Sequence, residues 1–376
     1  MSLREKIEKE IQLHGPMSFS HYTQLCLYDP ELGYYSRSAE QFGKAGDFFT
    51  SSDVHAVFGR LLARQFEEMW RALDSPGVIE LIELGPGRGL FARDVLDWSE
   101  KKFPDFFRAL RYTLVESSFV LRQKLRVTLA NHIASGKACA PDTDQRSVPS
   151  HAATIVFANE FFDALPVEVI SARGELRIAF ENGRLVETWV QPSPAELEYL
   201  DRYSVHPDPG ERVEAALIGQ ECMANIARSV ERGFMLVIDY GFTRAEQLAG
   251  RHRGTVMAYR QHSASANPYE APGEQDITAH VNFTALAAAA QQQGMQVEEL
   301  ITQSQFLMGI GEPNQFADAF EECHLPQERA KVALQLKHLV TPAGMGESFH
   351  VLVASKRVEP AKISELSGLH FARSRL

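Results

Sequence analysis

The pattern of apolar and polar positions changes character at about residue 77. Beyond it, short apolar runs of strand length alternate with longer stretches whose apolar residues recur at helical spacing. Strands are expected at 78–84, 110–117, 153–160, 233–241, 295–303 and 348–358, and helices at 90–103, 119–133, 212–233 and 285–294. This alternation is typical of βαβ units, so the sequence predicts an α/β fold on a mostly parallel sheet.

The first 75 residues are expected to form a helical N-terminal extension. Helices are predicted at 3–15, closed by Gly15, at 18–29 and at 55–73. Between the last two lies a loop rich in glycine and hydroxyl groups.

Two insertions interrupt the alternation further along the chain. The first, at 171–204, contains a hairpin signal at Asn182-Gly183, and the second covers 254–282. The expected organisation is an extension over 1–75, a main domain over 76–357 with these insertions, and a peripheral tail over 358–376.

The composition is that of a globular protein with an acidic balance. The chain has 376 residues, of which 44% are hydrophobic, and its net charge is −11, which argues against a nucleic-acid partner. No apolar run reaches the length of a membrane span, and the charged N-terminus lacks a signal-peptide core. The cysteines lie far apart without metal-ligand spacing. We therefore expect a cytoplasmic protein with reduced thiols, no metal and no membrane partner.

Candidate chemistry gathers where the predicted strands end, because ligands of open parallel sheets bind there. The first strand ends in Glu83 and is followed by Gly85, Gly87 and Gly89 in the pattern G-x-G-x-G. Closely spaced glycines let a ligand approach the backbone at a helix N-terminus. An acid two positions before this pattern is typical of the nucleotide loop of class I S-adenosylmethionine-dependent methyltransferases, whereas a dinucleotide site prefers G-x-G-x-x-G.

Three further strands end in acidic residues. Glu116 can accept hydrogen bonds from both ribose hydroxyls of a nucleoside, although alone it is an ordinary turn residue. The stretch "ANEFFDALPV" places Asn159, Glu160 and Asp163 after an apolar strand. Glu160 and Asp163 either cap a following helix or face a methyl acceptor. In a helix they would lie one turn apart, on the same face. Another strand ends in Asp239-Tyr240-Gly241, where a turn role and a role in lining the acceptor pocket are equally open.

Seven segments in order resemble the MidA-like family (DUF185, COG1565), and they span roughly residues 15–312. The segments are "GYYSRSAEQFGKAGDFFTSSDVHAVFG", "IELGPGRG", "LVESS", "ANEFFDALPV", "VIDYG", "PGEQDITAHVNFTAL" and "TQSQFLMGIG". This family includes a mitochondrial complex I assembly factor that is a protein-arginine methyltransferase.

The resemblance implies a class I, Rossmann-like methyltransferase fold and S-adenosyl-L-methionine as cofactor. The fold would have a mostly parallel seven-stranded sheet with helices on both faces. The loop at 46–53, by itself more often a surface turn, would then cover the cofactor. The residues expected to bind the cofactor are Gly46, Asp47, Phe48, Thr50, Glu83, Gly85, Gly87, Gly89, Glu116 and Asn159.

The sequence departs from the family pattern beside the expected acceptor. After G-D-F-x-T the family usually has S/A-P-E-I-S-Q, whereas this chain has "SSDVHA", so His55 replaces a serine and Asp53 a glutamate. Leu90 replaces a common threonine after the glycine loop. These departures concern the acceptor rather than the methyl donor.

Three functions remain open for the expected site. Arginine is always cationic, so it suits carboxylates such as Glu160 and Asp163, with Asp53, Asp239, Tyr240 and Asp276 as substrate-binding candidates. A hydroxyl or phenol acceptor would favour a histidine base, with His55 ahead of His262 and His280. A non-catalytic assembly factor would need neither the glycine loop nor Glu116. The expected partner is a methyl acceptor, either protein or small molecule, and a homodimer is open.

Overall fold

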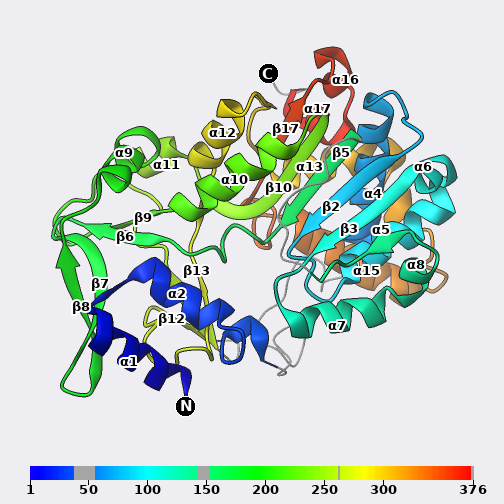
Figure 1. Cartoon of the computed structure of the whole chain (residues 1–376). Coiled ribbons are helices and arrows are strands. Elements are labelled where there is room, and N and C mark those ends of the chain that lie inside the picture. The colour runs from blue at the N-terminus through cyan, green and yellow to red at the C-terminus, as the bar shows by residue number, and fades with distance from the viewer. Residues whose placement is uncertain (38–55, 143–152, 261–262, 374–376) are drawn as a thin grey trace. The chain divides into compact units, whose positions relative to one another are not determined.

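The computed structural model of the chain describes residues 1–37, 56–142, 153–260 and 263–373 (Figure 1). These residues form two compact units that alternate along the sequence. The hairpin unit comprises 1–37, 161–225, 240–260 and 263–289, and the sheet unit comprises 56–142, 153–160, 226–239 and 290–373. Among the helices of these ranges, none has the length and apolar character needed to cross a membrane.

The sheet unit is built on a mixed β-sheet. Strands follow the order β10 (Gly233–Phe242), β5 (Ala153–Asn159), β2 (Ile79–Leu84), β3 (Leu110–Val115) and β4 (Ala138–Cys139), and every neighbouring pair is parallel. Strand β17 (Phe349–Lys356) follows β10 in the order, and β15 (Gln296–Val297) and β16 (Ile301–Thr302) pair with it antiparallel. The strand expected at 295–303 is therefore two short strands, and the sheet is mixed rather than simply seven-stranded.

Apolar packing holds the ends of the parallel strands in place. Strands β2 and β5 bury almost all of their side chains, as expected for parallel strands with covered faces. Phe157 of β5 stacks on Phe91 of α5 (Leu90–Lys102), with 4.7 Å between ring centroids. Phe66 of α4 (Ala56–Ala72) meets Phe157 edge-on. Both helices therefore fix β5, whose last residue is Asn159.

The other helices that lie wholly within the sheet unit all come after residue 103 of the chain. They are α6 (Pro104–Ala109), α7 (Phe119–Thr128), α8 (Ala130–Ala134), α13 (Gln303–Gly311), η2 (Glu312–Asn314), α14 (Ala317–Phe320), α15 (Pro326–Val340), α16 (Pro360–Ser364) and α17 (Ser367–Arg373). Helices α10 (Leu217–Ser229) and α12 (Phe283–Gln292) run from the hairpin unit into the sheet unit.

The C-terminal segment is not the peripheral tail that the sequence suggested. Ile363, Leu366 and Leu369 are at most 4% exposed. The backbone N–H of Gly368 donates to Gln65 of α4 at 3.0 Å. The segment therefore packs into the sheet unit through apolar side chains of α16, of α17 and of the link between them.

The hairpin unit contains an antiparallel sheet. Its strands are β1 (Met17–Ser18), β7 (Gly174–Glu181), β6 (Glu168–Ser171) and β9 (Arg212–Ala215), with β8 (Arg184–Val190) also paired with β7. Asn182 and Gly183 both have positive φ, which confirms the predicted hairpin and matches a tight turn between twisted strands. Figure 1 shows α1 (Leu3–His14) beside this hairpin, where Arg4 donates to the carbonyl of Gly183.

One predicted helix is wrong at its start. Residues 212–215 form strand β9, paired with β6, and α10 begins only at Leu217. Four residues are too few to separate helical from strand periodicity, so the pairing with β6 decided the outcome.

A second, three-stranded sheet of the hairpin unit has the order β12 (Ser263–Ser265), β11 (Met257–Arg260), β13 (Asp276–Thr278). Strand β14 (Val281–Asn282) pairs with the last residues of β10. Helix α2 (Phe19–Tyr28), η1 (Tyr34–Ser36), α9 (Pro194–Tyr203) and α11 (Arg244–Leu248) complete the unit. Its core buries Ile7, Tyr22 and Ile178 completely.

The units do not follow the linear division expected from the sequence. Helices α1 and α2 share a core with residues of both insertions, while α4 belongs to the sheet unit. The boundaries at 75/76 and 357/358 are therefore replaced by an interleaved arrangement, because apolar contacts rather than sequence order define each core.

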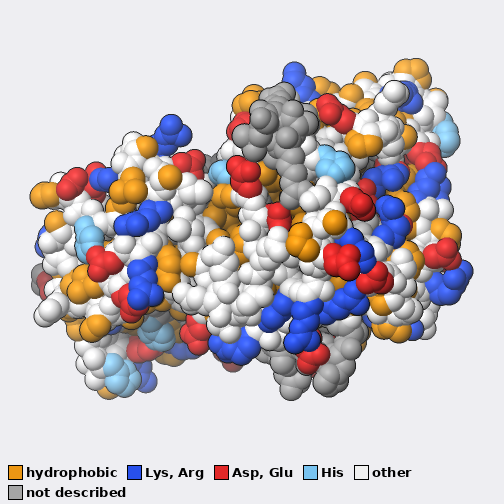
Figure 2. Space-filling model, turned by 90° about the horizontal axis from the view of Figure 1, so that it is seen from above, with side chains coloured by type: hydrophobic (Ala, Val, Ile, Leu, Met, Phe, Trp, Pro, Cys, Tyr) orange, Lys and Arg blue, Asp and Glu red, His pale blue; other side chains and the backbone are white. Residues whose placement is uncertain are grey.

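Charged side chains of both signs lie among one another on the face shown in Figure 2. Within the sheet unit, Lys101 and Arg60 both pair with Glu322, and Arg64 pairs with Asp318 at 2.6 Å. Arg60 and Asp318 are buried, so the cost of removing their charges from water offsets much of the attraction in their pairs, and these pairs are not the main source of stability.

Candidate active site

The glycine loop between β2 and α5 has the geometry of a ligand cradle. Gly85, Gly87 and Gly89 have φ of 66°, 54° and 73°, in the left-handed region where side chains are strained. Gly89 is the N-cap of α5. Because it has no side chain, it makes no capping hydrogen bond to the first backbone N–H groups of that helix. A Cβ at Gly87 would meet no atom within 4 Å, whereas at Gly89 it would lie 3.1 Å from Leu125. The open space at Gly87 lets a ligand reach the backbone.

Glu116 lies directly beside this loop, as the sequence predicted. Its carboxylate accepts hydrogen bonds from the backbone N–H groups of Gly87 at 3.1 Å and Ser118 at 2.8 Å. Burial, only partly offset by these hydrogen bonds, raises the pKa of Glu116 to about 7. A carboxylate held by the glycine loop can accept hydrogen bonds from the hydroxyl groups of a nucleoside bound at that loop.

Glu83, the other acid beside the loop, is buried against the neighbouring strand β3. Its carboxyl group is 5% exposed and accepts a hydrogen bond from the Tyr112 hydroxyl at 2.8 Å. Burial raises the pKa of Glu83 to about 8, and the charge of Glu116 contributes in the same direction. Glu83 is therefore mostly protonated at neutral pH, a property that the residue pattern did not reveal.

The polar residues after β5 do not begin a helix, so the expected one-turn spacing of Glu160 and Asp163 is wrong. Glu160 instead has φ of 50°, and its backbone N–H donates to the carbonyl of Ile238 in β10 at 3.0 Å. Asn159 donates from Nδ2 to Glu160 Oε1 at 3.1 Å. A left-handed glutamate costs roughly 1–3 kcal/mol and typically persists at functional sites.

Asp163 belongs to the hairpin unit, whereas Asn159 and Glu160 belong to the sheet unit. Asp163 is 5% exposed, and its Oδ2 accepts a hydrogen bond from the Tyr240 hydroxyl at 2.6 Å. Burial raises the pKa of Asp163 to about 6, against the effect of this hydrogen bond. A carboxyl group that titrates near neutrality can hold or release a proton under physiological conditions.

Asp276 lies in the same unit as Asp163 and Tyr240. It is also 5% exposed, and its Oδ1 accepts a hydrogen bond from the Tyr35 hydroxyl at 3.0 Å. Tyr35, in η1, was not singled out from the sequence. The only signal was its place in the motif "GYYS", which by itself does not distinguish a site tyrosine from a core one.

The remaining predicted site residues are either buried or lie outside the described part of the chain. Asp239 lies within β10, which continues to Phe242 beyond the expected strand end, and it is 0% exposed. His280 lies 3.2 Å from His252 between Nδ1 atoms, and burial, with the charge of His252, lowers its pKa to about 4. The predicted residues outside the described part of the chain are Gly46, Asp47, Phe48, Thr50, Asp53, His55 and His262.

A small pocket lies within the hairpin unit. Asp163 is the one charged residue among those that line it, and most of the walls are apolar, including Phe19, Leu27 and Ile277. The pocket is an apolar site around one carboxylate, with room for about one water molecule.

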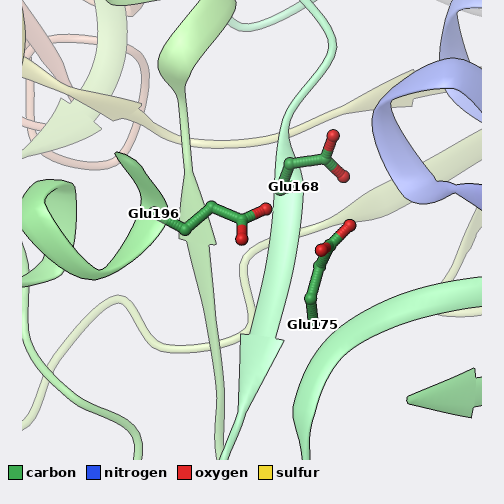
Figure 3. Close-up of side chains that lie close together, drawn as sticks. All are labelled: Glu168, Glu175 and Glu196. Carbon is green, nitrogen blue, oxygen red and sulfur yellow. The ribbon is translucent and has the colours of Figure 1, made fainter. Parts of the chain in front are cut away.

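Three carboxylates of the hairpin unit also come together, as Figure 3 shows for Glu168, Glu175 and Glu196. Their nearest oxygen atoms lie within 4.8 Å of one another. Each group has a protein partner, because Glu168 accepts from Ser20, Glu175 pairs with Arg177, and Glu196 accepts from Ser193. These contacts account for the cluster as part of the fold.

The chain is similar over residues 61–301 to a family described as S-adenosyl-L-methionine-dependent methyltransferases, Methyltransf_28. It is 30% identical to the protein arginine methyltransferase NDUFAF7, mitochondrial, of Danio rerio, over 93% of this chain and 85% of that protein. It is 27% identical to the NDUFAF7 homolog of Drosophila melanogaster, over 99% of this chain and 89% of that protein.

A solved structure supports the same relationship. A COG1565 superfamily member from Burkholderia thailandensis, bound to S-adenosyl-homocysteine, is 27% identical with a TM-score of 0.83. The similarity covers 98% of this chain and 94% of that one. These relatives confirm the family that the sequence motifs indicated.

The predicted cytoplasmic localisation is contradicted by these comparisons. The relatives from Danio rerio and Drosophila melanogaster are named as mitochondrial proteins. The prediction rested on the lack of a recognisable N-terminal signal, and the residues at one end of a sequence do not exclude an organelle.

Proposed function

Because the chain belongs to this family of S-adenosyl-L-methionine-dependent methyltransferases, we propose that its methyl acceptor is an arginine side chain of a protein. Its relatives from Danio rerio and Homo sapiens carry the name protein arginine methyltransferase. The observation that carries the proposal is the buried Asp163, held by Tyr240, in a pocket with apolar walls.

The residues of the sheet unit fit the cofactor. The left-handed glycines, the open space at Gly87 and the carboxylate of Glu116 would hold its nucleoside and amino-acid parts. When bound, the cofactor supplies an electrophilic methyl group. A chain that served only as an assembly scaffold would have no use for this set of residues.

The acceptor places a demand on this chain that a carboxylate can meet. Guanidinium is cationic, so its nitrogen must be oriented and must lose a proton when it is methylated. We assign both tasks to Asp163, whose carboxylate can bind the guanidinium and take up the proton. Its raised pKa, about 6, makes it a stronger base than an ordinary aspartate.

Tyr240 has a supporting role in this proposal. Its hydroxyl donates to Asp163 Oδ2 and so fixes the direction of the carboxylate. Glu160, which follows β5 in the sheet unit, is the second candidate for proton uptake. The left-handed backbone at Glu160 supports a specific role, and a variant of each acid separates the two candidates.

The test is to incubate the purified protein with isotope-labelled cofactor and a protein extract, and to identify the labelled residue by mass spectrometry. Labelled methylarginine in protein is the expected result. Phenolic and hydroxylated small molecules are supplied in parallel. Label in those compounds, with none in arginine, would contradict the proposal and favour O-methylation.

A further inference from the structure

A group of tyrosine and aspartate side chains in the hairpin unit goes beyond the single carboxylate assigned above. It consists of Tyr35, Asp163, Tyr240, Tyr259 and Asp276, and we call it the tyrosine–aspartate cluster. These residues come from η1, the turn after β5, β10, β11 and β13. Segments far apart in the sequence therefore converge on one polar group.

The hydrogen bonds of the cluster repeat one arrangement. Tyr240 donates to Asp163 at 2.6 Å, and Tyr35 donates to Asp276 at 3.0 Å. Tyr259 of β11 lies directly opposite Asp276 of β13 in the antiparallel ladder. Each aspartate is thus oriented by a tyrosine hydroxyl.

The two aspartates share the same surroundings. Burial raises the pKa of the Tyr35 hydroxyl, and the charges of Asp276 and Asp163 raise it further. The pKa of Tyr259 is raised by burial and by the same two aspartates. The backbone brings the two segments together as well, because the N–H of Ala279, three residues after Asp276, donates to the carbonyl of Asp163 at 3.0 Å.

Tyr35 is itself held in place by aromatic neighbours. The ring of Tyr34 meets it edge-on with 5.2 Å between centroids, and the ring of Tyr28 lies at 5.5 Å. Tyr28 is fixed in turn, because its hydroxyl donates to the carbonyl of Ala164, next to Asp163. A tyrosine supported in this way can fix the position of Asp276.

We propose that Asp276 is a second carboxylate for the acceptor guanidinium, alongside Asp163, and that Tyr35 is the residue that positions it. The inference rests on the proposed arginine acceptor. Guanidinium presents five N–H donors in one plane and can engage two carboxylates at once, whereas a phenol cannot. Tyrosine rings around the cation add a cation–π attraction. The pair therefore selects a planar cationic acceptor.

The experiment uses the full chain and a peptide library with a central arginine between randomised positions. A matched library carries citrulline, which has nearly the same shape without the charge, and serves as a competitor. Steady-state methylation gives kcat and KM for the wild type, D276N and Y35F. Calorimetry measures cofactor binding, and circular dichroism verifies folding.

D276N is expected to raise KM for the arginine library at least about tenfold, because a charge-assisted hydrogen bond is lost. The preference for arginine over citrulline should fall with it, while cofactor affinity stays within about twofold. Y35F, which removes one hydroxyl, should raise KM about threefold, with a smaller change in kcat. D276E should recover part of the loss if the carboxylate itself is needed.

Tyr269 and Glu187 supply a matched control in the same unit. Tyr269 donates to Glu187 Oε1 at 3.0 Å, so Y269F removes the same kind of contact outside the cluster, whereas E187Q also weakens the Arg212–Glu187 ion pair. Both are expected to leave KM unchanged. If D276N and Y35F also leave KM and the citrulline preference unchanged while the wild type methylates arginine, the inference is overturned and the proposed function stands.

One further result would contradict the proposed function as well as the inference. If the wild type methylates a hydroxyl group and no arginine peptide, mass spectrometry of the product identifies that failure directly. Y35F keeps the test decisive if D276N does not fold, because the loss of one hydroxyl changes packing little.

Discussion

The two units of this protein build their candidate sites in different ways. In the sheet unit, the cofactor cradle comes from consecutive residues around the glycine loop, with Glu116 held by the backbone of the same loop. In the hairpin unit, side chains from five separate segments form the tyrosine–aspartate cluster. One site depends on backbone conformation and the other on side-chain hydrogen bonds.

This difference has a consequence for how each site can vary. A cradle of left-handed glycines tolerates little substitution, because any Cβ strains the backbone. A cluster of side chains can exchange members while the strands that carry them persist. We therefore expect the methyl donor to be fixed by the sheet unit and the choice of acceptor to reside in the hairpin unit.

The largest effect is expected from Asp163→Asn. Loss of a group that takes up a proton should reduce kcat by about 10²–10⁴-fold, with cofactor affinity unchanged. In the wild type, kcat/KM should rise with pH through about 6, because only ionised Asp163 accepts the proton. The variant should lose this rise. Glu160→Gln serves as the comparison, and a larger loss in that variant would move the chemistry to the sheet unit.

Gly87→Val should weaken cofactor binding about 10–100-fold, because a β-branched residue is strained at φ of 54° and its side chain would enter the ligand space. Isothermal titration calorimetry measures the affinity. Gly183→Val, at φ of 78° in the turn between β7 and β8, imposes similar strain in the hairpin unit. It should lower stability without changing cofactor affinity, and equal losses in both variants would contradict the division between the units.

Glu116→Gln should weaken cofactor binding about tenfold, because a neutral amide accepts weaker hydrogen bonds from hydroxyl groups than a carboxylate does. The wild type should bind less tightly as pH falls below about 7, where Glu116 becomes protonated. Titrations at pH 6 and 8 measure this effect. The variant should show no such difference, and a wild-type affinity independent of pH would remove Glu116 from the binding site.

The last expected effect concerns the stability of the fold rather than activity or binding, and it involves Glu83. The unfolded chain releases the Glu83 proton near pH 4.5, whereas the folded protein keeps it up to about pH 8. Its stabilising contribution is therefore complete below pH 4.5 and is lost as pH rises to 8, by at most roughly 1.4 kcal/mol per pH unit. Urea denaturation at several pH values should give a shallower decline for Glu83→Gln. The exposed Glu299→Gln should match the wild type.

The sequence predicted the parts that depend on neighbouring residues. The hairpin at Asn182-Gly183, the glycine loop and the strands expected at 78–84 and 110–117 follow from local patterns, and the structure has all of them. The prediction was wrong for a short segment. Residues 212–215 were expected to be helical, but they form a strand because they pair with β6. The C-terminal tail was underestimated because its few apolar residues acquire a partner only when α4 is in place.

The sequence by itself determined the family, the cofactor and the residues of the glycine loop, because a run of left-handed backbone positions leaves a local signature in its glycines. Only the tertiary structure decided that Tyr35 meets Asp276, that Glu83 is buried against Tyr112, and that the chain alternates between two cores. Those features depend on contacts between distant segments, and their energies come from burial and hydrogen bonds that no short stretch of sequence contains.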